Sequence, residues 1–503
     1  MTFHGLVKRI VHRRAKAPCL YHGDRTLSYG EVDEASDRAA WALAALGVGP
    51  GGRVGLFAPN SIEYVIAMLA TWKVGAMTVH IDVRLAAELA YYLGDGDPHV
   101  LIYSAGVRDA VRRDGAVAPS LKARICLEGP EDGAEAWEAC LARATPHQLP
   151  TVPEDAPAHL SYTSGSTGKP KGAVLAHEPT CRATSCIAER LGLTCADVTL
   201  GPTGLSSSYH LVANLLPGLQ RGAAVGLMAQ WDAREAWRTI AARGVSVFVA
   251  NPLVLADLLH TAPPGGPPPG LRMGISGGGP VPPDLKRDFY GRLRVPLVES
   301  YGQSELGGFV ALGRPEPPDP ARLAAIGPML PDKEVIIGDD EDREVPIGEA
   351  GQILLRGGFM AGYWRRPEAT AATLKGGCLH TGDVGKMDEE GNLYLLTRVS
   401  ERIVTGGRAV YPRLLEEALL RHPAVHRVAV FGLPDKTLGQ IAKAAVSLHP
   451  GASATERELM AHCRKELGDG APARLEILES LPMTPTGKIS KMDLLARERA
   501  LAR

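Results

Sequence analysis

The sequence predicts an α/β protein with a largely parallel sheet, divided into more than one domain. Two observations carry this prediction. Helical and strand patterns alternate between residues 30 and 103 and again between 245 and 299, as they do in βαβ units. The chain also has 503 residues, which is too long for a single hydrophobic core. We therefore expect at least two domains, of which the first is built from strands and helices in alternation.

The elements follow in order from local patterns. Residues 31–46 carry apolar side chains at helical spacing and end at Gly47, and residues 61–74 show the same spacing. Short apolar runs predict strands at 53–58 and, just after Pro98, at 100–103. The same criteria predict a strand at 245–250, a helix at 253–259 and a strand at 295–299. Two proline-rich stretches, 262–270 and 314–320, are expected to be surface loops.

The pattern changes from about Gly348. Short strands are expected at 352–356, 393–397 and 402–405, in a smaller and more antiparallel region. Residues 401–503 then predict an α+β unit, with helices at 414–420 and 456–467 and strands at 425–431 and 442–448. We place the main domain boundary near 398–401.

Composition excludes several classes of function. The net charge is -1, so no general attraction to nucleic acid or to an anionic membrane is expected. The sequence contains no window of 18 consecutive apolar residues, so no transmembrane helix is predicted. The basic residues 1–18 are interpreted as a first surface helix rather than a transit peptide. Eight scattered cysteines without a C-x-x-C pair indicate reduced thiols, so we expect a cytoplasmic protein. From the charge and the hydropathy together, we expect no nucleic-acid or membrane partner.

The strongest motif is a loop rich in glycine and hydroxyl side chains at residues 162–172, which read YTSGSTGKPKG. Such residues supply N–H and O–H donors, and two lysines add charge that suits a phosphate chain. The motif differs from a P-loop, because Pro170 stands where Ser or Thr would bind magnesium. It therefore predicts a phosphate loop of another type, followed by a strand at 173–176. The candidate binding residues are Thr163, Ser164, Gly165, Ser166, Thr167, Gly168, Lys169 and Lys171.

This eleven-residue stretch resembles the signature of the adenylate-forming superfamily, which includes acyl-CoA synthetases, peptide-synthetase adenylation domains and beetle luciferases. The resemblance covers essentially the whole chain, and its pattern is most similar to acyl- or aryl-CoA ligases. It implies a large N-terminal domain of stacked α/β subdomains with a β-barrel-like part at residues 1–397. It further implies a hinge at 398–400 and a small, mobile α+β cap domain at 401–503.

Other segments resemble the nucleotide site of that superfamily. Residues 301–305 read YGQSE, where Glu305 is the implied magnesium ligand and Ser304 keeps a hydroxyl for the α-phosphate. In residues 381–383 (TGD), Asp383 is implied to accept hydrogen bonds from both ribose hydroxyls, with Arg398 as a second ribose contact. Residues 276–280 resemble a loop that lies against the adenine and the acyl group. The implied nucleotide-binding residues here are Gly277, Gly278, Gly279, Pro280, Ser300, Tyr301, Gly302, Gln303, Ser304, Asp383 and Arg398.

Residues 484–488 (TPTGK) resemble the catalytic lysine loop, so Lys488 is the implied catalytic residue of the first half-reaction. The resemblance implies ATP and Mg²⁺ as cofactors, with CoA as co-substrate. A carboxylate attacks the α-phosphate of ATP to give an acyl-adenylate and pyrophosphate, and a thiol then displaces AMP. The ammonium of Lys488 would contact the carboxylate and the α-phosphate in the first step only.

The acid is expected to be aromatic or of medium acyl length. Residues 208–210 (SYH) resemble the aromatic-His pair of acyl- and aryl-CoA ligases, whereas enzymes for α-amino acids carry Asp after Phe at this point. His210 is therefore a third catalytic candidate beside Lys488 and Glu305, and is implied to line or gate the acyl pocket. The pocket candidates are Tyr209, His210, Ala250, Asn251, Gly277 and Gly278.

The acceptor is open at this point. Ser400 takes a hinge position where a charged residue is usual, and Gly406, Gly407 and Arg408 stand where the superfamily guides the pantetheine arm. CoA is the first expectation. A carrier-protein thiol, an amine or an inorganic nucleophile such as nitrite is the alternative, and a non-catalytic nucleotide-binding homologue is a second one. Richness in Ala, Gly, Arg and Pro fits a bacterium of high genomic GC and a natural-product pathway. The oligomeric state is not predicted.

Overall fold

The computed structural model describes residues 1–501 except Asp132, residues 164–168 and residues 484–488. The chain forms two compact units. The first comprises Met1–Val335 and Leu355–Leu379, and the second comprises Ile336–Leu354 and His380–Arg503. The predicted hinge, 398–400, lies within the second of these units, where Val399–Glu401 form a short 3₁₀ turn. The domain bounds predicted from the sequence stay a prediction.

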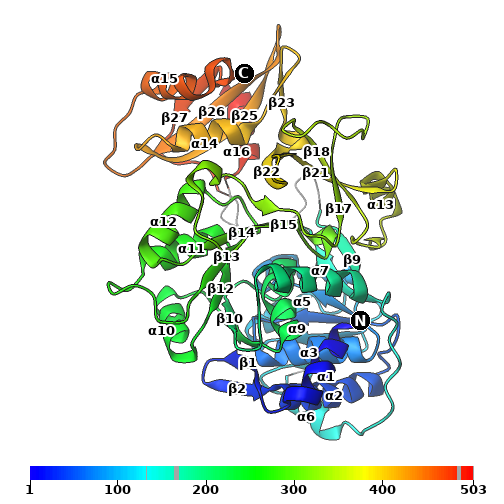
Figure 1. The fold of residues 1–503 in the computed structure, drawn as a ribbon. Coiled ribbons are helices and arrows are strands. Elements are labelled where there is room, and N and C mark those ends of the chain that lie inside the picture. The colour runs from blue at the N-terminus through cyan, green and yellow to red at the C-terminus, as the bar shows by residue number, and fades with distance from the viewer. Residues whose placement is uncertain (132, 164–168, 484–488, 502–503) are drawn as a thin grey trace. The chain divides into compact units, whose positions relative to one another are not determined.

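Two mixed sheets form the frame of the first unit (Figure 1). In one sheet the strand order is β15-β14-β13-β12-β10-β11-β1-β2, and every pair is parallel except the two at its edges, β14–β15 and β1–β2. These strands are β1 Pro18–His22, β2 Arg25–Ser28, β10 Val198–Gly201, β11 Ala224–Leu227, β12 Val247–Ala250, β13 Met273–Ser276, β14 Leu297–Gln303 and β15 Gly308–Leu312.

The other sheet has the order β19-β9-β8-β4-β3-β5-β6-β7. Its strands from β8 to β7 are parallel, whereas β9 pairs antiparallel with both β8 and β19. These strands are β3 Arg53–Phe57, β4 Met77–His80, β5 Val100–Tyr103, β6 Ala123–Cys126, β7 Glu135–Ala136, β8 Pro157–Tyr162, β9 Gly172–Ala176 and β19 Gly362–Tyr363.

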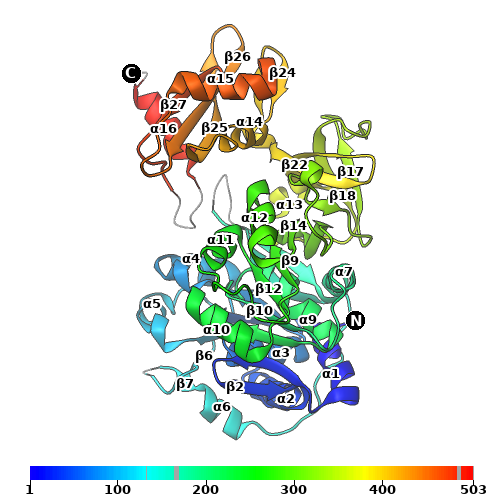
Figure 2. The same cartoon turned by 60° about the vertical axis from the view of Figure 1, so that its left-hand side comes forward.

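Helices fill the space between the sheets and cover their outer faces (Figure 2). Helix α3, Ile62–Lys73, packs on β3 and β4 of one sheet and on β1 of the other. All its residues except Glu63 are buried, which fits a sequence whose apolar residues are not confined to one stripe. The remaining helices of this unit are α1 Phe3–Arg14, α2 Tyr29–Ala45, α4 Leu89–Gly96, α5 Arg108–Asp114, α6 Trp137–Arg143, α7 His177–Arg190, α8 Ser208–His210, α9 Leu216–Arg221, α10 Ala233–Arg243, α11 Pro252–His260, α12 Pro283–Leu293 and α13 Pro367–Thr373.

The predicted alternation in this unit is confirmed, with small shifts at the ends of elements. Helix α2 begins at Tyr29, two residues before the predicted start, because the Ser28 side chain and Glu31 form a reciprocal capping box. Strand β14 runs to Gln303, beyond the predicted end at residue 299, because its last residues pair with β15. The basic N-terminus is the predicted helix: α1 buries Phe3, Leu6 and Val7 in the first unit.

The second unit holds two β-structures and the last helices of the chain. One sheet contains β22-β21-β18-β17 in that order, and β21 pairs antiparallel with β22, as predicted for this region. The α+β part has a sheet ordered β24-β23-β26-β25, with β27 beside β26 and with α14 and α15 packed on it. The elements are β17 Glu334–Gly338, β18 Gly351–Arg356, β21 Cys378–Met387, β22 Asn392–Arg398, β23 Ile403–Thr405, β24 Arg408–Val410, α14 Pro412–Leu420, β25 Val425–Asp435, β26 Gly439–Leu448, α15 Glu456–Leu467, β27 Arg474–Ile477 and α16 Lys491–Leu501.

Within the described ranges, no helix is both long and apolar enough to cross a membrane.

Candidate active site

The stem of the predicted phosphate loop is an antiparallel hairpin of β8 and β9. Tyr162 pairs with Gly172 in the register, and the backbone N–H of Thr163 donates to the carbonyl of Lys171 at 2.9 Å. The Thr163 hydroxyl oxygen accepts from the backbone N–H of Lys171 at 3.4 Å. Residues 164–168, the centre of the predicted loop, lie outside the described residues. Lys169 and Lys171 lie at the end of the loop that joins β9.

Helix α4 holds both ends of this loop. The Tyr162 hydroxyl, just before the loop, donates to Oδ2 of Asp95 at 3.1 Å, and the Tyr91 hydroxyl donates to the carbonyl of Pro170, just after it. Tyr91 and Asp95 are one helical turn apart and therefore face the same side of α4. The Lys169 ammonium lies 5.4 Å from the centre of the Tyr91 ring. One helix thus fixes the spacing of the two loop ends.

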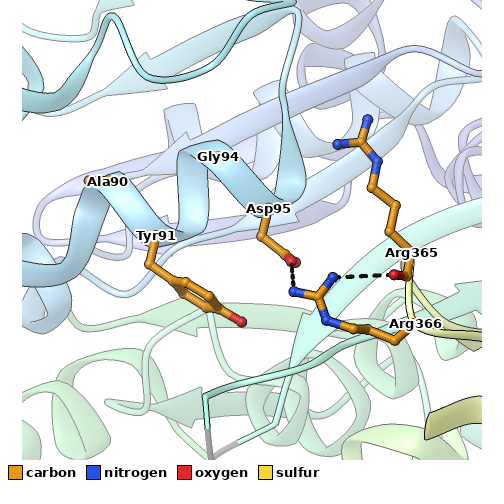
Figure 3. A pocket seen from close by; sticks show the side chains of 6 residues that line it. All are labelled: Ala90, Tyr91, Gly94, Asp95, Arg365 and Arg366. Atoms are coloured by element: carbon orange, nitrogen blue, oxygen red, sulfur yellow. Dashed lines mark hydrogen bonds and ion pairs between the residues drawn. The ribbon is translucent and has the colours of Figure 1, made fainter. Parts of the chain in front are cut away.

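A cavity of about 370 Å³ lies beside these contacts (Figure 3). Asp95 accepts from the Arg366 guanidinium at 2.5 Å on its other oxygen, and Figure 3 shows Arg366 between Asp95 and the Arg365 carbonyl. Burial, and after it Asp95, raises the pKa of Tyr91. Sequence reasoning missed this support, because α4 is far from the loop in the sequence. The lining residues are Ala90, Tyr91, Gly94, Asp95, Arg365 and Arg366.

Glu305 is linked to the stem of the predicted phosphate loop by Tyr363, a residue that the sequence analysis did not select. Strand β19 pairs with β9, placing Tyr363 opposite Ala173. The Tyr363 hydroxyl donates to Oε1 of Glu305 at 2.6 Å, and the Lys171 ammonium lies 4.3 Å from the centre of the same ring. The Ser304 hydroxyl is 3.3 Å from that of Ser208. The structure therefore brings Lys171 and Glu305, predicted separately, to one aromatic side chain.

The predicted acyl-pocket residues follow the carboxyl ends of adjacent parallel strands, where α/β sheets bind ligands. Tyr209 is buried, and its hydroxyl donates to the carbonyls of Ile275, at 3.3 Å, and Ala250, at 3.4 Å. A Cβ atom at Gly277 would lie 2.2 Å from Oγ of Ser300 and 2.7 Å from Cε2 of Tyr209. Glycine is thus required for this close approach.

Two of these pocket candidates have structural partners. The Ala250 side chain packs in the apolar core around Phe248, so only its carbonyl meets Tyr209. The Asn251 side chain caps α11 by accepting from the backbone N–H of Val254 at 3.0 Å. Gly278 is exposed with φ +72°, and Gly279 and Pro280 continue the same loop after β13.

His210 is fully buried, and burial lowers its pKa to about 4. The imidazole is therefore neutral at pH 7. Its Nε2 lies 3.0 Å from the amide nitrogen of Asn214, one turn further along a π-helical segment, Leu211–Leu215. Such π turns are frequent at functional sites. Asn214 was missed, although its spacing of four residues from His210 was visible in the sequence.

In the second unit the predicted ribose residues form an ion pair. Asp383 and Arg398 face each other across β21 and β22, and Nε of Arg398 lies 2.8 Å from Oδ1 of Asp383. Asp383 is buried, whereas the Arg398 side chain is about half exposed. The Thr381 hydroxyl donates to the carbonyl of Ile353 at 2.7 Å and accepts from the Asp383 N–H at 3.0 Å. Asp383 and Arg398, which are 15 positions apart in the sequence, are therefore neighbours in space.

The predicted hinge and acceptor residues also lie in the second unit. Ser400 is exposed in the 3₁₀ turn, and Gly406 and Gly407 form the tight turn between β23 and β24 with φ +55° and +79°. Positive φ at both positions is the requirement of a type I′ hairpin turn. Arg408 follows on β24 and is exposed. Lys488 lies outside the described residues.

The described residues contain no group of three or more His, Cys, Asp or Glu side chains placed to hold a metal ion together. A magnesium ion bound through phosphate oxygens and water needs only one or two protein carboxylates. Glu305 fits that requirement: its side chain is partly exposed, and its Oε1 accepts from the Tyr363 hydroxyl.

Comparison with known proteins identifies the family and agrees with the fold. The sequence profile of the AMP-binding enzyme family matches residues 7–364, and that of the AMP-binding enzyme C-terminal domain matches residues 414–488. The chain therefore belongs to the AMP-binding, or adenylate-forming, enzyme family. The predicted α/β fold with a large N-terminal domain and a small C-terminal domain is confirmed.

The relatives are acid–CoA ligases and related enzymes. The chain is 31% identical to sulfoacetate–CoA ligase of Cupriavidus necator, covering 93% of this chain and 92% of the relative. It is 32% identical to the long-chain-fatty-acid–CoA ligase FadD13 of Mycobacterium tuberculosis, with the same coverage. It is 31% identical to the fatty acid–[acyl-carrier-protein] ligase ScoC of Streptomyces coeruleorubidus, covering 95% and 93%. The protein is thus an AMP-forming enzyme of the CoA ligase family that binds ATP and acts on a carboxylic acid.

Solved structures of related enzymes share the fold of this chain. The anthranilate CoA ligase AuaEII, in complex with anthranoyl-AMP, superimposes with a TM-score of 0.90 at 26% identity, covering 100% of this chain and 98% of the other. The amide bond synthetase McbA of Marinactinospora thermotolerans superimposes with a TM-score of 0.88 at 28% identity, covering 99% and 100%.

Proposed function

We propose that this protein joins ATP to an aromatic or medium-length carboxylic acid, giving an acyl-adenylate and pyrophosphate, and then transfers the acyl group to the thiol of CoA. The observation that carries the proposal is the meeting of Lys171 and Glu305 at Tyr363, beside the stem of the phosphate loop. A cation for phosphate oxygens and a carboxylate for a metal ion are the two groups that nucleotide activation requires at one place.

We assign the nucleotide contacts as follows. Thr163, Lys169 and Lys171 bind phosphate oxygens with the rest of the loop, and Ser304 donates to the α-phosphate. Glu305 is the protein ligand of Mg²⁺, which when bound neutralises charge on the phosphates. Asp383 accepts from the ribose hydroxyls, and the ion pair with Arg398 keeps its carboxylate charged and oriented. Ser300, Tyr301, Gly302 and Gln303 support the same segment from β14.

In each of the two proposed steps, one bond forms and one bond breaks at the atom that is attacked. A carboxylate oxygen attacks the α-phosphorus, and the bond to the pyrophosphate oxygen breaks. The thiol then attacks the acyl carbon and loses its proton, while AMP leaves with the former carboxylate oxygen. We propose that Lys488 orients the acid in the first step and that rotation at 398–400 removes it in the second, as the family resemblance implies.

The described side chains favour an acid with an apolar or aromatic body. Around Tyr209 and Gly277 the predicted pocket offers a flat ring, backbone and a neutral imidazole. None of the pocket candidates is a charged residue, so nothing among them would pair with a second carboxylate or with an α-amino group on the substrate. Anthranilate is the acid of one similar structure, which fits this reading.

CoA is the acceptor that most of the relatives use by name, and the exposed Arg408 beside the Gly406-Gly407 turn suits its phosphates. Two comparisons favour a second candidate, because ScoC is named for a carrier-protein acceptor and McbA for amide formation. We keep a carrier-protein thiol or an amine as the alternative acceptor. The eight unpaired cysteines favour a reducing compartment, so we place the reaction in the cytoplasm.

The test is a panel of aryl and alkyl acids incubated with ATP and Mg²⁺, with and without CoA, in which AMP, adenylate and thioester are read by mass spectrometry. We expect a thioester and fast AMP release only when CoA is present. AMP release at the same rate without CoA would show another acceptor. No AMP or adenylate with any acid would contradict the proposed adenylation and favour a non-catalytic nucleotide-binding protein.

A further inference from the structure

Three segments far apart in the sequence meet at Tyr363. The segment 360–364 runs beside β9, with the Trp364 N–H donating to the carbonyl of Gly172 at 2.8 Å and the Ala361 N–H donating to that of Val174 at 2.9 Å. At its other end the Met360 N–H donates to the backbone carbonyl of Glu305 at 2.7 Å. The segment therefore joins the strand after the phosphate loop to the turn that carries the carboxylate.

Tyr363 is itself held rigidly at this junction. The residue is only 7% exposed, and its backbone N–H donates to the Thr370 hydroxyl at 2.8 Å. The approach of Gly362 to Thr370 is so close that a Cβ atom there would lie 2.9 Å from Cγ2, at a φ of +153°. A residue fixed on both backbone and ring can position what touches it.

Two contacts of the Tyr363 side chain involve the two groups assigned to the nucleotide. The hydroxyl donates to Oε1 of Glu305 at 2.6 Å, while the face of the ring receives the Lys171 ammonium at 4.3 Å. A phenol that donates to one carboxylate oxygen leaves the other oxygen for a cation and stops rotation of the carboxylate. A ring face attracts an ammonium without neutralising its charge, so the lysine can still bind phosphate.

We infer that Tyr363 is a positioning residue that orients the Glu305 carboxylate for Mg²⁺ and the Lys171 ammonium for the phosphates of ATP. The inference deepens the proposed function and rests on it, because it takes Glu305 as the metal ligand. Hydrogen-bond partners of a ligating carboxylate commonly change metal affinity or activity by about 10- to 100-fold when removed.

The two contacts can be separated by substitution. Tyr363→Phe removes the hydroxyl and keeps the ring, whereas Tyr363→Leu removes both. Tyr103→Phe is a matched control, since Tyr103 lies in the same unit, is buried, and donates to a carboxylate, Glu131, at 3.4 Å outside the proposed site. Glu305→Gln removes the proposed ligand itself.

The measurement is the affinity for α,β-methylene-ATP, which cannot be cleaved at the α-phosphate, by calorimetry with and without Mn²⁺. The dissociation constant without Mn²⁺ divided by that with Mn²⁺ reports how strongly metal and nucleotide binding are coupled, without turnover. We expect Tyr363→Phe to reduce this ratio by about 10- to 100-fold while metal-free affinity stays within about twofold. Tyr363→Leu should also weaken metal-free binding, because the ammonium loses its ring. Tyr103→Phe should match the wild type.

Melting temperatures measured beside the calorimetry identify any variant that fails to fold, and Phe is expected to fold because it keeps the buried ring. A normal Mn²⁺ ratio in Tyr363→Phe, together with a reduced one in Glu305→Gln, would overturn the positioning role and leave the proposed function in place. A normal ratio in Glu305→Gln would overturn the metal role of Glu305 and the inference with it.

Discussion

The contact between Tyr91 and Pro170 allows a quantitative test of how the phosphate loop is supported. The substitution Tyr91→Phe removes one hydroxyl that donates to the carbonyl at the end of the loop and leaves the ring under Lys169. A hydrogen bond of this kind contributes about 0.5–1.5 kcal/mol. If that free energy goes into holding the loop ready for phosphate, its loss should raise the KM for ATP by about 2- to 12-fold.

The other end of the loop gives a larger effect. Asp95 accepts from Tyr162 at 3.1 Å and from Arg366 at 2.5 Å, so Asp95→Ala breaks two bonds and removes the carboxylate that pairs with the Arg366 guanidinium. Hydrogen bonds to charged groups contribute about 1.5–3 kcal/mol each. We expect the KM for ATP to rise by more than tenfold in this variant.

The assay is steady-state AMP formation, with ATP varied at saturating acid and then acid varied at saturating ATP. Only the KM for ATP should change in Tyr91→Phe, because the contact lies on the phosphate side. Tyr103→Phe serves as the control for removal of a hydroxyl in the same unit. The reasoning is refuted if Tyr91→Phe leaves the KM for ATP unchanged, or if it raises both constants equally.

Two further predictions concern burial. Lys286 and Glu299 form a buried ion pair at 2.5 Å, so Lys286→Met should destabilise the protein by about 3–5 kcal/mol, measured as a shift of the urea midpoint, and an unshifted midpoint would contradict the pairing. For His210, burial lowers the pKa from 6.5 to about 4, so the folded state resists protonation. Its contribution to stability is therefore present above pH 6.5 and is lost as pH falls toward 4. The imidazole proton signal that disappears in His210→Asn should not titrate above pH 5, and a midpoint near 6.5 would show that the ring is hydrated.

Much of the fold follows from local patterns. The strands at 53–57 and 100–103 and helix α3 are mostly apolar segments that are buried on several sides, and their predicted bounds agree within a few residues. The capping box that starts α2 is also local, since it needs only Ser28 and Glu31. Such signals survive because neighbouring residues alone determine them.

The predicted site residues were found from motifs, which are short and contiguous. Their supports were missed for the opposite reason. Tyr363 lies 58 residues from Glu305 and almost 200 from Lys171, and the sequence around it carries no sign that its hydroxyl will reach a carboxylate. Asp95 supports Tyr162 from a helix that precedes it by 67 residues. The pairing of β19 with β9, a tertiary event, brings Tyr363 beside Lys171.

The central claim is that a carboxylate oxygen of the acid attacks the α-phosphorus of ATP. The direct test uses an accepted acid labelled with ¹⁸O in both carboxylate oxygens, in unlabelled water, with CoA present. Because AMP leaves with the attacking oxygen, the account predicts AMP that carries one ¹⁸O atom and a thioester that carries the other. Unlabelled AMP would show that water attacks the nucleotide, and formation of ADP would show attack at another phosphorus. Either result would contradict the assignment of this protein as an acid-activating, AMP-forming ligase.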